Sequence, residues 1–243
     1  EFRHVLFRSG GYAEEVSVAP ENLSAIPDSI DFAGAAGLTS TYGTAYYALI
    51  DRGELKSGET LLVLGASGGV GLAAVEIGKA LGAKVIACAS SEEKLAVCRE
   101  HGADATINYA TEDMRARVKE ITKGKGLDVV YDPVGGDYSE LALRDMAWGG
   151  RFLVIGFAAG PIPKISLNLP LIKGCSIVGV WVGSMSKRNP EKRRAMSAEI
   201  WKLYAAGKLK PHVWGTYPLE KAADALNAIA ARKVAGKVVL TVA

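Results

Sequence analysis

The sequence predicts an α/β fold with a doubly wound, six-stranded parallel sheet. Three observations support this prediction: six short apolar runs lie between Thr60 and Trp181, segments of helical periodicity separate most of them, and several helical segments end at a glycine. Runs that are apolar throughout are typical of strands in a parallel sheet whose two faces are both covered by helices. Because crossovers between such strands are right-handed, the sheet is expected to be doubly wound.

The strands and helices of the sheet region are expected at regular spacing along the chain. Gly82 and Gly102 each close a helix, a position where glycine is favoured because it adopts the left-handed conformation readily. The expected strands are 60–64, 84–89, 105–108, 127–131, 151–155 and 176–181, and the expected helices between them are 70–81, 92–101, 111–122 and 137–147.

Further elements are expected on either side of the sheet. A short strand at 12–19 and a helix at 31–52, which carries small residues on one face, precede it. A long amphipathic helix at 190–206, a helix at 219–232 and a final strand at 236–242 follow it.

The composition is that of an ordinary globular protein. Of the 243 residues, 49% are hydrophobic and 23% charged, which argues against disorder. The formal net charge of +3 is too small to indicate nucleic-acid binding, and no uncharged apolar run is long enough to span a membrane. The three cysteines form no closely spaced pair, which favours a reducing, cytoplasmic setting and predicts no metal site.

A glycine-rich turn follows the first expected strand. The segment Gly65–Gly71 reads GASGGVG, so that Ala66 occupies the first glycine position of the dinucleotide-binding pattern. Glycines here allow a tight turn and a close approach of backbone amides to a pyrophosphate, at the positive end of the next helix. We therefore predict a Rossmann-type cofactor site; the alternative is a turn that is merely tight. Its residues are Ala66, Ser67, Gly68, Gly69, Val70 and Gly71.

The end of the second expected strand indicates which dinucleotide is bound. An acidic residue about 20 positions after the turn binds the ribose 2′-hydroxyl of NAD. Here Ser90 and Ser91 occupy this place, and Lys94 follows. Hydroxyls with a nearby ammonium attract a 2′-phosphate, so NADPH is favoured, with Glu92 and Glu93 expected to point outward. The alternative for Lys94 is an ordinary solvated lysine.

The chain resembles the zinc-independent branch of the medium-chain dehydrogenase/reductase superfamily, and within it the NADPH:quinone oxidoreductases, or ζ-crystallin-like proteins. The resemblance covers nearly all of residues 10–243. Its markers are Gly11–Glu14, Thr44–Tyr46, the turn at 65–71, Asn108-Tyr109, Asp132–Gly136, Gly149–Arg151, Val154–Phe157 and Gly236–Leu240.

The resemblance implies roles for individual residues. Gly68, Gly69 and Gly71 would contact the pyrophosphate, and the segment around Asn168 and Leu169 would help to form a homodimer. Ala36 stands where zinc-dependent relatives carry a cysteine ligand, so no metal is expected. The resemblance identifies no catalytic residue. It would place Ser90, Lys94 and Tyr109 at the adenosine ribose and 2′-phosphate, Thr44, Val134, Gly156 and Phe157 beside the nicotinamide, and Lys237 near the phosphates.

For two of these residues the resemblance leaves an alternative open. Tyr109 could instead be an aromatic residue at the end of a strand that covers a helix. Phe157 could instead be an ordinary hydrophobic loop residue.

Relatives begin with a β-barrel-like catalytic domain, most of which is expected to be missing here. Residues 10–40 would be its remnant with the start of the linking helix, 41–185 the NADP-binding domain, and 186–243 the return to the catalytic domain. The implied activity is hydride transfer from NADPH to a quinone or related α,β-unsaturated carbonyl. The alternatives are an enoyl-thioester or alkenal reductase and a non-catalytic NADPH-binding protein.

Overall fold

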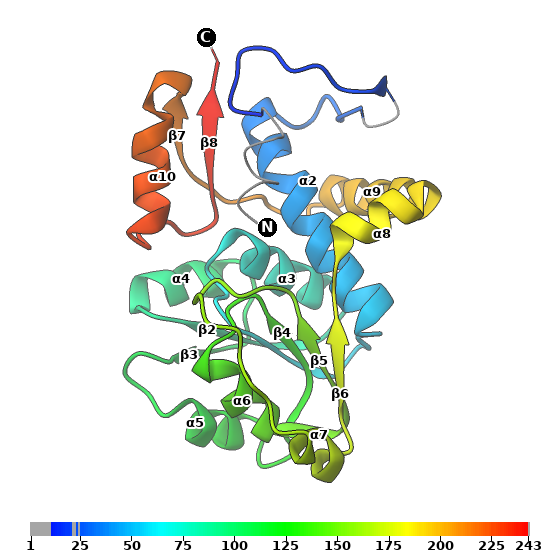
Figure 1. The fold of residues 1–243 in the computed structure, drawn as a ribbon, viewed down its shortest axis with the longest axis vertical. Helices are drawn as coiled ribbons and strands as arrows, with labels where there is room; N and C mark the ends of the chain where they lie inside the picture. Colours follow the sequence, from blue (N-terminus) through cyan, green and yellow to red (C-terminus); the bar gives the residue numbers. More distant parts are fainter. Residues whose placement is uncertain (1–10, 21–22, 24, 243) are drawn as a thin grey trace.

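The six predicted strands form one parallel sheet (Figure 1). The computed structural model describes residues 11–20, 23 and 25–242. The strand order is β3-β2-β1-β4-β5-β6, so the direction of winding reverses between β1 and β4. The predicted fold class is thereby confirmed. The strands are β1 (Thr60–Val63), β2 (Lys84–Ala89), β3 (Ala105–Asn108), β4 (Leu127–Asp132), β5 (Met146–Val154) and β6 (Ser176–Gly179).

Both faces of the sheet are covered, as the continuous apolar runs predict. Along β1, Leu61 and Val63 point into one core, whereas Leu62 and the following Leu64 point into the other. The first core is closed by α2 (Phe32–Tyr46), α3 (Gly69–Ala80) and α4 (Glu92–Glu100). The second is closed by α5 (Met114–Ile121), α6 (Asp137–Arg144) and α7 (Asn168–Lys173).

Helix α2 continues without a break into a π-helical segment, η2 (Tyr47–Arg52). Asp31 caps its start by accepting a hydrogen bond from the Gly34 amide at 2.7 Å. Its end lies at Gly53, whose carbonyl accepts a hydrogen bond from the Arg151 guanidinium of β5 at 2.7 Å. The predicted helix at 31–52 is therefore confirmed, and its far end is fixed to the sheet.

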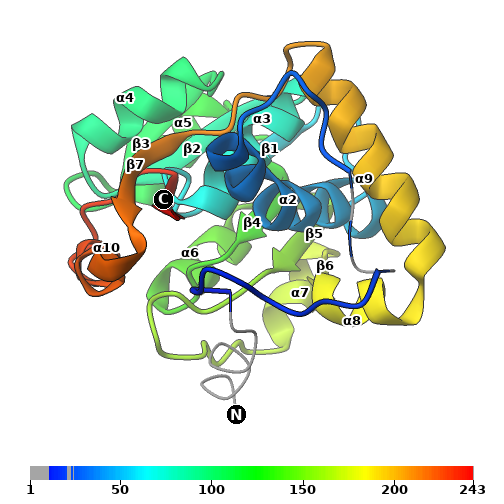
Figure 2. The same ribbon diagram turned by 90° about the horizontal axis from the view of Figure 1, so that it is seen from above.

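The residues after the sheet return to α2 and to the first helices of the sheet region. Helix α8 (Val182–Arg188) leads into α9 (Pro190–Ala205), which lies alongside α2 (Figure 2). We call residues 207–242 the C-terminal arm. It contains β7 (Val213–Pro218), η3 (Leu219–Lys221), α10 (Ala222–Ala230) and β8 (Lys237–Thr241), and β7 and β8 pair in parallel as a separate two-stranded sheet.

Some sequence predictions are wrong. Residues 12–19 form no strand: they are exposed, and none of the strands in the described part of the chain pairs with them.

Strand β7 and helices α7 and α8 were not predicted, because they are short or lack a clear apolar period. Strand β5 begins at Met146 rather than 151, since an irregularity in its pairing with β4 lengthens it. Gly10, where the first predicted domain begins, lies outside the described residues.

Within the described residues, no helix is both long enough and apolar enough to cross a membrane.

Candidate functional site

The glycine-rich turn lies at the carboxyl end of β1, where the strand order reverses. Gly68 is the N-cap of α3, and the helix begins at Gly69. A side chain at Gly71 would bring its Cβ to 2.4 Å from the Gly65 carbonyl oxygen, so only glycine allows the turn to pack on its own helix. The amides of the first turn of α3 have no partner within the helix and can therefore bind an anion. A glycine-rich turn of this kind at the start of a helix is typical of phosphate-binding sites.

Alanine at position 66 is compatible with this turn. Its methyl group is fully buried in the core beneath the loop, and its amide donates a hydrogen bond to the Cys88 carbonyl of β2 at 2.9 Å. The methyl group of Ala66 thus packs in the core and does not displace the loop.

The residues predicted for the ribose 2′-phosphate gather at the ends of β2 and β3. The Lys94 ammonium lies 3.5 Å from the Ser90 hydroxyl. Tyr109 lies beside Ser90: burial raises the pKa of the Tyr109 phenol, and the charge of Arg232 and hydrogen bonding to Ser90 partly oppose this rise. The Tyr109 ring also packs on Tyr138 of α6, with ring centroids 4.5 Å apart. Tyr109 therefore fits both interpretations: it is an aromatic residue at the end of a strand that packs on a helix, and it also lies beside Ser90.

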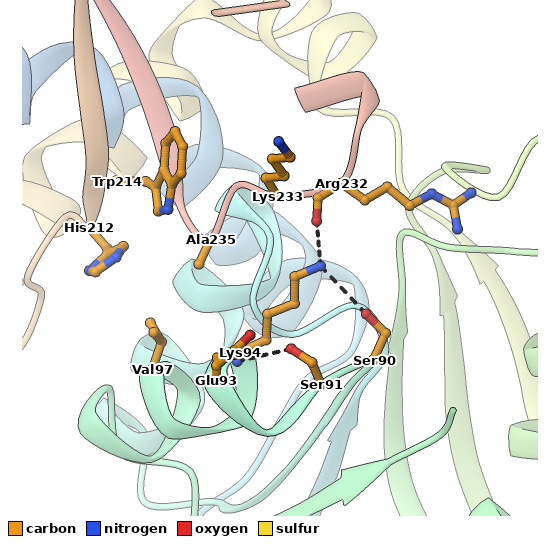
Figure 3. A pocket seen from close by; sticks show the side chains of 10 residues that line it. All are labelled: Ser90, Ser91, Glu93, Lys94, Val97, His212, Trp214, Arg232, Lys233 and Ala235. Carbon is orange, nitrogen blue, oxygen red and sulfur yellow. Dashed lines mark hydrogen bonds between the residues drawn. The ribbon is translucent and has the colours of Figure 1, made fainter. Parts of the chain in front are cut away.

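The C-terminal arm adds residues to this cluster that sequence reasoning missed. A cavity of about 510 Å³ is lined from the sheet side by Ser90, Ser91 and Lys94, and from the arm by Arg232 and Lys233 (Figure 3). Lys94 donates a hydrogen bond to the Arg232 carbonyl at 2.7 Å across 138 positions of sequence. The only sequence signal for these two cations was the pair Arg232-Lys233 just before the closing strand, and its proximity to Ser90 depends on the fold.

Ser91 and the acidic residues after it have mainly helical roles. Ser91 is the N-cap of α4 and accepts from the Lys94 amide at 3.4 Å. Glu92 points outward to an ion pair with Arg99, as predicted. Glu93 is exposed but lines the cavity, so the expectation of an entirely outward side chain is only partly met.

The residues predicted for the nicotinamide lie at the ends of β4 and β5. A Cβ at Gly65 would meet the Val134 side chain at 2.7 Å, so Val134 lies against the phosphate-binding turn. Phe157, which is 40% exposed, packs over Gly135. The Gly156 amide donates to the Asp132 carbonyl at 3.3 Å. Val134, Gly156 and Phe157 are thus brought together.

A buried carboxylate shapes this part of the site. Asp132 ends β4 and is 3% exposed. One of its oxygens accepts from the amides of Val134 and Gly135, both at 2.8 Å, and the other accepts from the Ser139 hydroxyl at 2.6 Å. These bonds satisfy the buried charge and fix the loop that carries Val134. The sequence placed Asp132 within a motif but gave it no role.

Thr44 and Lys237 both lie outside the six-stranded sheet, and of the two only Lys237 contacts the glycine-rich turn. The Thr44 hydroxyl donates within α2 to the Ser40 carbonyl at 2.9 Å. Thr41, three residues earlier and not predicted, lies against the glycine-rich turn: a Cβ at Gly69 would stand 3.2 Å from its methyl group. The same Cβ would stand 2.8 Å from the side chain of Lys237, which therefore lies over the start of α3.

The described part of the chain holds no group of three or more His, Cys, Asp or Glu residues arranged to bind a metal ion. Ala36, at the position of the cysteine ligand in zinc-dependent relatives, is exposed on α2. What the site offers instead is an anion cradle with cations at one end and an apolar loop at the other.

Comparison with known proteins agrees with this geometry. The family model for zinc-binding dehydrogenases matches residues 69–201, more than half of the chain. The chain belongs to this family. Within the family it groups with quinone oxidoreductases: it is 41% identical to the quinone oxidoreductase-like protein 2 homolog of Nematostella vectensis, over 96% of this chain and 64% of that protein. It is 38% identical to the quinone oxidoreductase of Pseudomonas aeruginosa, over 95% of this chain and 71% of that protein.

Solved structures show the same fold. The quinone oxidoreductase of Escherichia coli, determined in complex with NADPH, has a TM-score of 0.85 and 33% identity, over 90% of this chain and 68% of that one. The CurK enoyl reductase has a TM-score of 0.83 and 28% identity, over 93% of this chain and 67% of that one. The chain thus spans roughly two thirds of the length of the family members that it matches, and 64% of the Nematostella protein.

Proposed function

We propose that this chain binds NADPH as the cofactor-binding part of an oxidoreductase that transfers hydride to a quinone or a related α,β-unsaturated carbonyl. The observation that carries the proposal is the group of hydroxyls and cations at the end of β2, where Ser90 and Lys94 lie 3.5 Å apart and line one cavity together with Arg232. The E. coli relative, whose structure contains NADPH, supports the choice of cofactor.

In this proposal the protein binds and orients while the cofactor, when bound, supplies the hydride. The α3 amides hold the pyrophosphate, and Ser90, Lys94 and Arg232 hold the 2′-phosphate. The loop fixed by Asp132 supports the nicotinamide through Val134. Because Ala36 cannot ligate zinc, we infer a zinc-independent reaction in which positioning and exclusion of water carry the catalysis.

We also retain the division into regions predicted from the sequence. Residues 41–185 would bind the cofactor, and 10–40 and 186–243 would belong to the catalytic domain. The return of the C-terminal arm to the start of α2, where a Cβ at Gly37 would lie 3.7 Å from the Val213 side chain, supports this division.

A homodimer forms part of the proposal. Strand β6 is the edge of the sheet, and the apolar side chains of Ile177 on it and of Trp148, Leu171 and Ile172 nearby are 41–83% exposed. Pairing of two β6 edges would cover them. Sedimentation of the wild-type chain and of an Ile177→Lys variant tests this: we expect a dimer for the former and a monomer for the latter. A wild-type monomer would refute the dimer.

The cofactor assignment is tested by fluorescence titration with NADPH and NADH. We expect the wild type to bind NADPH more tightly than NADH. We expect Ser90→Asp to lower the affinity for NADPH by about 10- to 100-fold and to raise the affinity for NADH, because a carboxylate repels the 2′-phosphate. Ser40→Asp, on the exposed side of α2, is the matched control and should change neither affinity. Equal binding of the two nucleotides by the wild type would contradict the assignment.

The reaction is tested by following NADPH oxidation with a quinone, an enal and an enoyl thioester. A preference for the thioester would favour the second candidate, an enoyl reductase, which the likeness to the CurK enoyl reductase supports. Each acceptor should be tried with this chain and with one extended to the length of its relatives. Binding without turnover by either chain would indicate a non-catalytic NADPH-binding protein.

A further inference from the structure

Helix α3 buries a carboxylate that the proposed reaction does not use. Glu76 is 4% exposed and lies between Val75 and Ile77, both fully buried. A charge at such a position is strongly unfavourable unless it is paired and hydrogen-bonded. Its presence in the helix that starts at the phosphate-binding turn therefore needs an explanation.

Three segments of the chain converge on Glu76. One oxygen accepts from the Tyr42 hydroxyl of α2 at 2.6 Å and from the Lys210 amide of the C-terminal arm at 2.9 Å. The other oxygen lies 2.5 Å from Nδ1 of His101, which follows the last residue of α4. The carboxylate thus joins two helices of the sheet region and the arm.

His101 extends this contact further into the arm. Its Nε2 lies 3.4 Å from Nδ1 of His212, and the two rings meet edge to face with centroids 5.2 Å apart. The His101 side chain is only 9% exposed. Since the Glu76 carboxylate accepts from Nδ1 of His101, the orientation of this ring is fixed and its Nε2 faces His212.

From His212 the contacts run directly to the phosphate-binding turn. The His212 carbonyl accepts from the Lys237 amide at 2.9 Å, and the neighbouring Gly236 amide donates to the Ser67 carbonyl at 2.7 Å. Gly236 forms an isolated parallel bridge with Gly68. The arm is therefore seated on the turn at one point and on Glu76 at another.

We propose that Glu76 is a positioning residue of the cofactor site: through the Lys210 amide and the His101–His212 pair it holds the C-terminal arm against the phosphate-binding turn. The arm carries Lys237 to the start of α3 and Arg232 to the 2′-phosphate position, so a displaced arm removes two cations from the site. This inference rests on the proposed binding of NADPH, and it predicts that a residue remote from the ligand sets part of the affinity.

The test combines two measurements on the whole chain. Hydrogen–deuterium exchange followed by mass spectrometry reports the arm through peptides covering 208–217 and 232–241, with β1 and β4 peptides as internal references. Calorimetric titration with NADP⁺ reports the site, and NAD⁺, which lacks the 2′-phosphate, separates the contribution of Arg232 and Lys94.

We expect Glu76→Ala to raise arm exchange at least about tenfold and to weaken NADP⁺ binding by about tenfold, the equivalent of one lost charge-assisted hydrogen bond. Glu76→Gln, which keeps a hydrogen-bonding group, should restore most of both quantities. If Glu76→Ala does not fold, His101→Ala takes its place, since His101 links Glu76 to the arm and is not among the residues that line the cavity; the same changes are expected there, smaller by a few fold.

Two controls separate positioning from general stability. Tyr42→Phe removes a partner of the same carboxylate that does not belong to the arm, so it should lower the melting temperature without raising arm exchange. Glu100→Gln removes an exposed carboxylate near the same histidines and should change neither quantity.

Wild-type arm exchange in Glu76→Ala, or raised exchange with unchanged NADP⁺ affinity, would overturn the inference. A wild-type chain that does not bind NADP⁺ would refute the proposed function instead. In that case the exchange data would still decide whether Glu76 holds the arm.

Discussion

The two halves of the proposed cofactor site are held in different ways. The turn at 65–71 and the loop after β4 are built into the sheet, and their shapes follow from close contacts such as that of Gly71 with Gly65. The C-terminal arm reaches the same site from outside: it buries Leu209 in the core and makes polar contacts, among them Lys94 with Arg232 and Gly236 with Ser67. One half is therefore preorganised by the core, whereas the other is docked onto it by a separate segment of the chain, and we expect this segment to open at a lower free-energy cost than the sheet.

The largest expected effect is that of Gly71→Val, which disrupts the turn at 65–71 in the preorganised half of the site. Its side chain would collide with the backbone of Gly65 and Ala66, so we expect a loss of about 3 kcal/mol of unfolding free energy and of NADP⁺ binding beyond detection. Denaturant unfolding and calorimetry measure the two losses. Gly183→Ala on α8, where a methyl group has room, is the control and should behave as wild type. A stable, binding-competent Gly71→Val would show that the turn is not fixed by the core.

Asp132→Ala should be the next most severe change. It leaves the part-buried amide of Val134 and the buried amide of Gly135 without an acceptor, so we expect about 2 kcal/mol of destabilisation and weaker cofactor binding. Ser139→Ala, which removes one donor and leaves both amides paired, should cost less than half as much. Equal losses in the two variants would mean that the loop is held by contacts other than these amide bonds.

Removal of a buried hydroxyl in β4 is expected not to destabilise the protein, in contrast to the two preceding variants. The Tyr131 phenol is fully buried, its oxygen meets no hydrogen-bond partner among the described residues, and burial raises its pKa. Tyr131→Phe is therefore expected to leave stability unchanged or to raise it by about 1 kcal/mol, as measured by thermal unfolding. A marked loss of stability would contradict this expectation. This variant should leave hydrogen exchange in the C-terminal arm unchanged. That result would show that a change inside the sheet does not affect the docked half of the site.

The smallest expected effect is a pH dependence confined to the docked half. Burial and the neighbouring His101 lower the pKa of His212, while Glu100 and Glu76 partly oppose this shift. The docked arm thus favours neutral His212, so its stabilising contribution is complete above the ordinary histidine pKa of about 6.5 and is lost as the pH falls below it. We expect this contribution of His212 to the stability of the docked arm to be less than about 1 kcal/mol, because His212 is partly exposed.

Arm exchange, corrected for the intrinsic effect of pH, should therefore rise between pH 7.5 and pH 5.5 in the wild type. In His212→Asn it should be nearly independent of pH. A rise of equal size in both proteins would assign the effect to another group.

The same contrast explains what could be predicted from the sequence. β2 and β3 are predicted to the residue: β2 is an apolar run, and both strands are bounded by turn residues and pair with strands close to them in the chain. β7 was missed: its side chains alternate between exposed and half-buried without a strong apolar signal, and its partner β8 lies across a helix. Arg232 and Glu76 were missed for a related reason, since their roles depend on contacts across more than 130 positions.

The unbroken run of α2 and η2 has a mechanical consequence. At a rise of about 1.5 Å per residue it is a rod about 30 Å long. One end is fixed twice to the sheet, by Arg52 bonded to the Gly179 carbonyl of the edge strand β6 and by Gly53 bonded to Arg151 of β5. The other end touches the arm at Gly37. A tilt of this rod would pivot at Gly53 and be largest beside the arm, so that strain applied to the β6 edge would be felt at the opposite end of the molecule, where the arm meets α2.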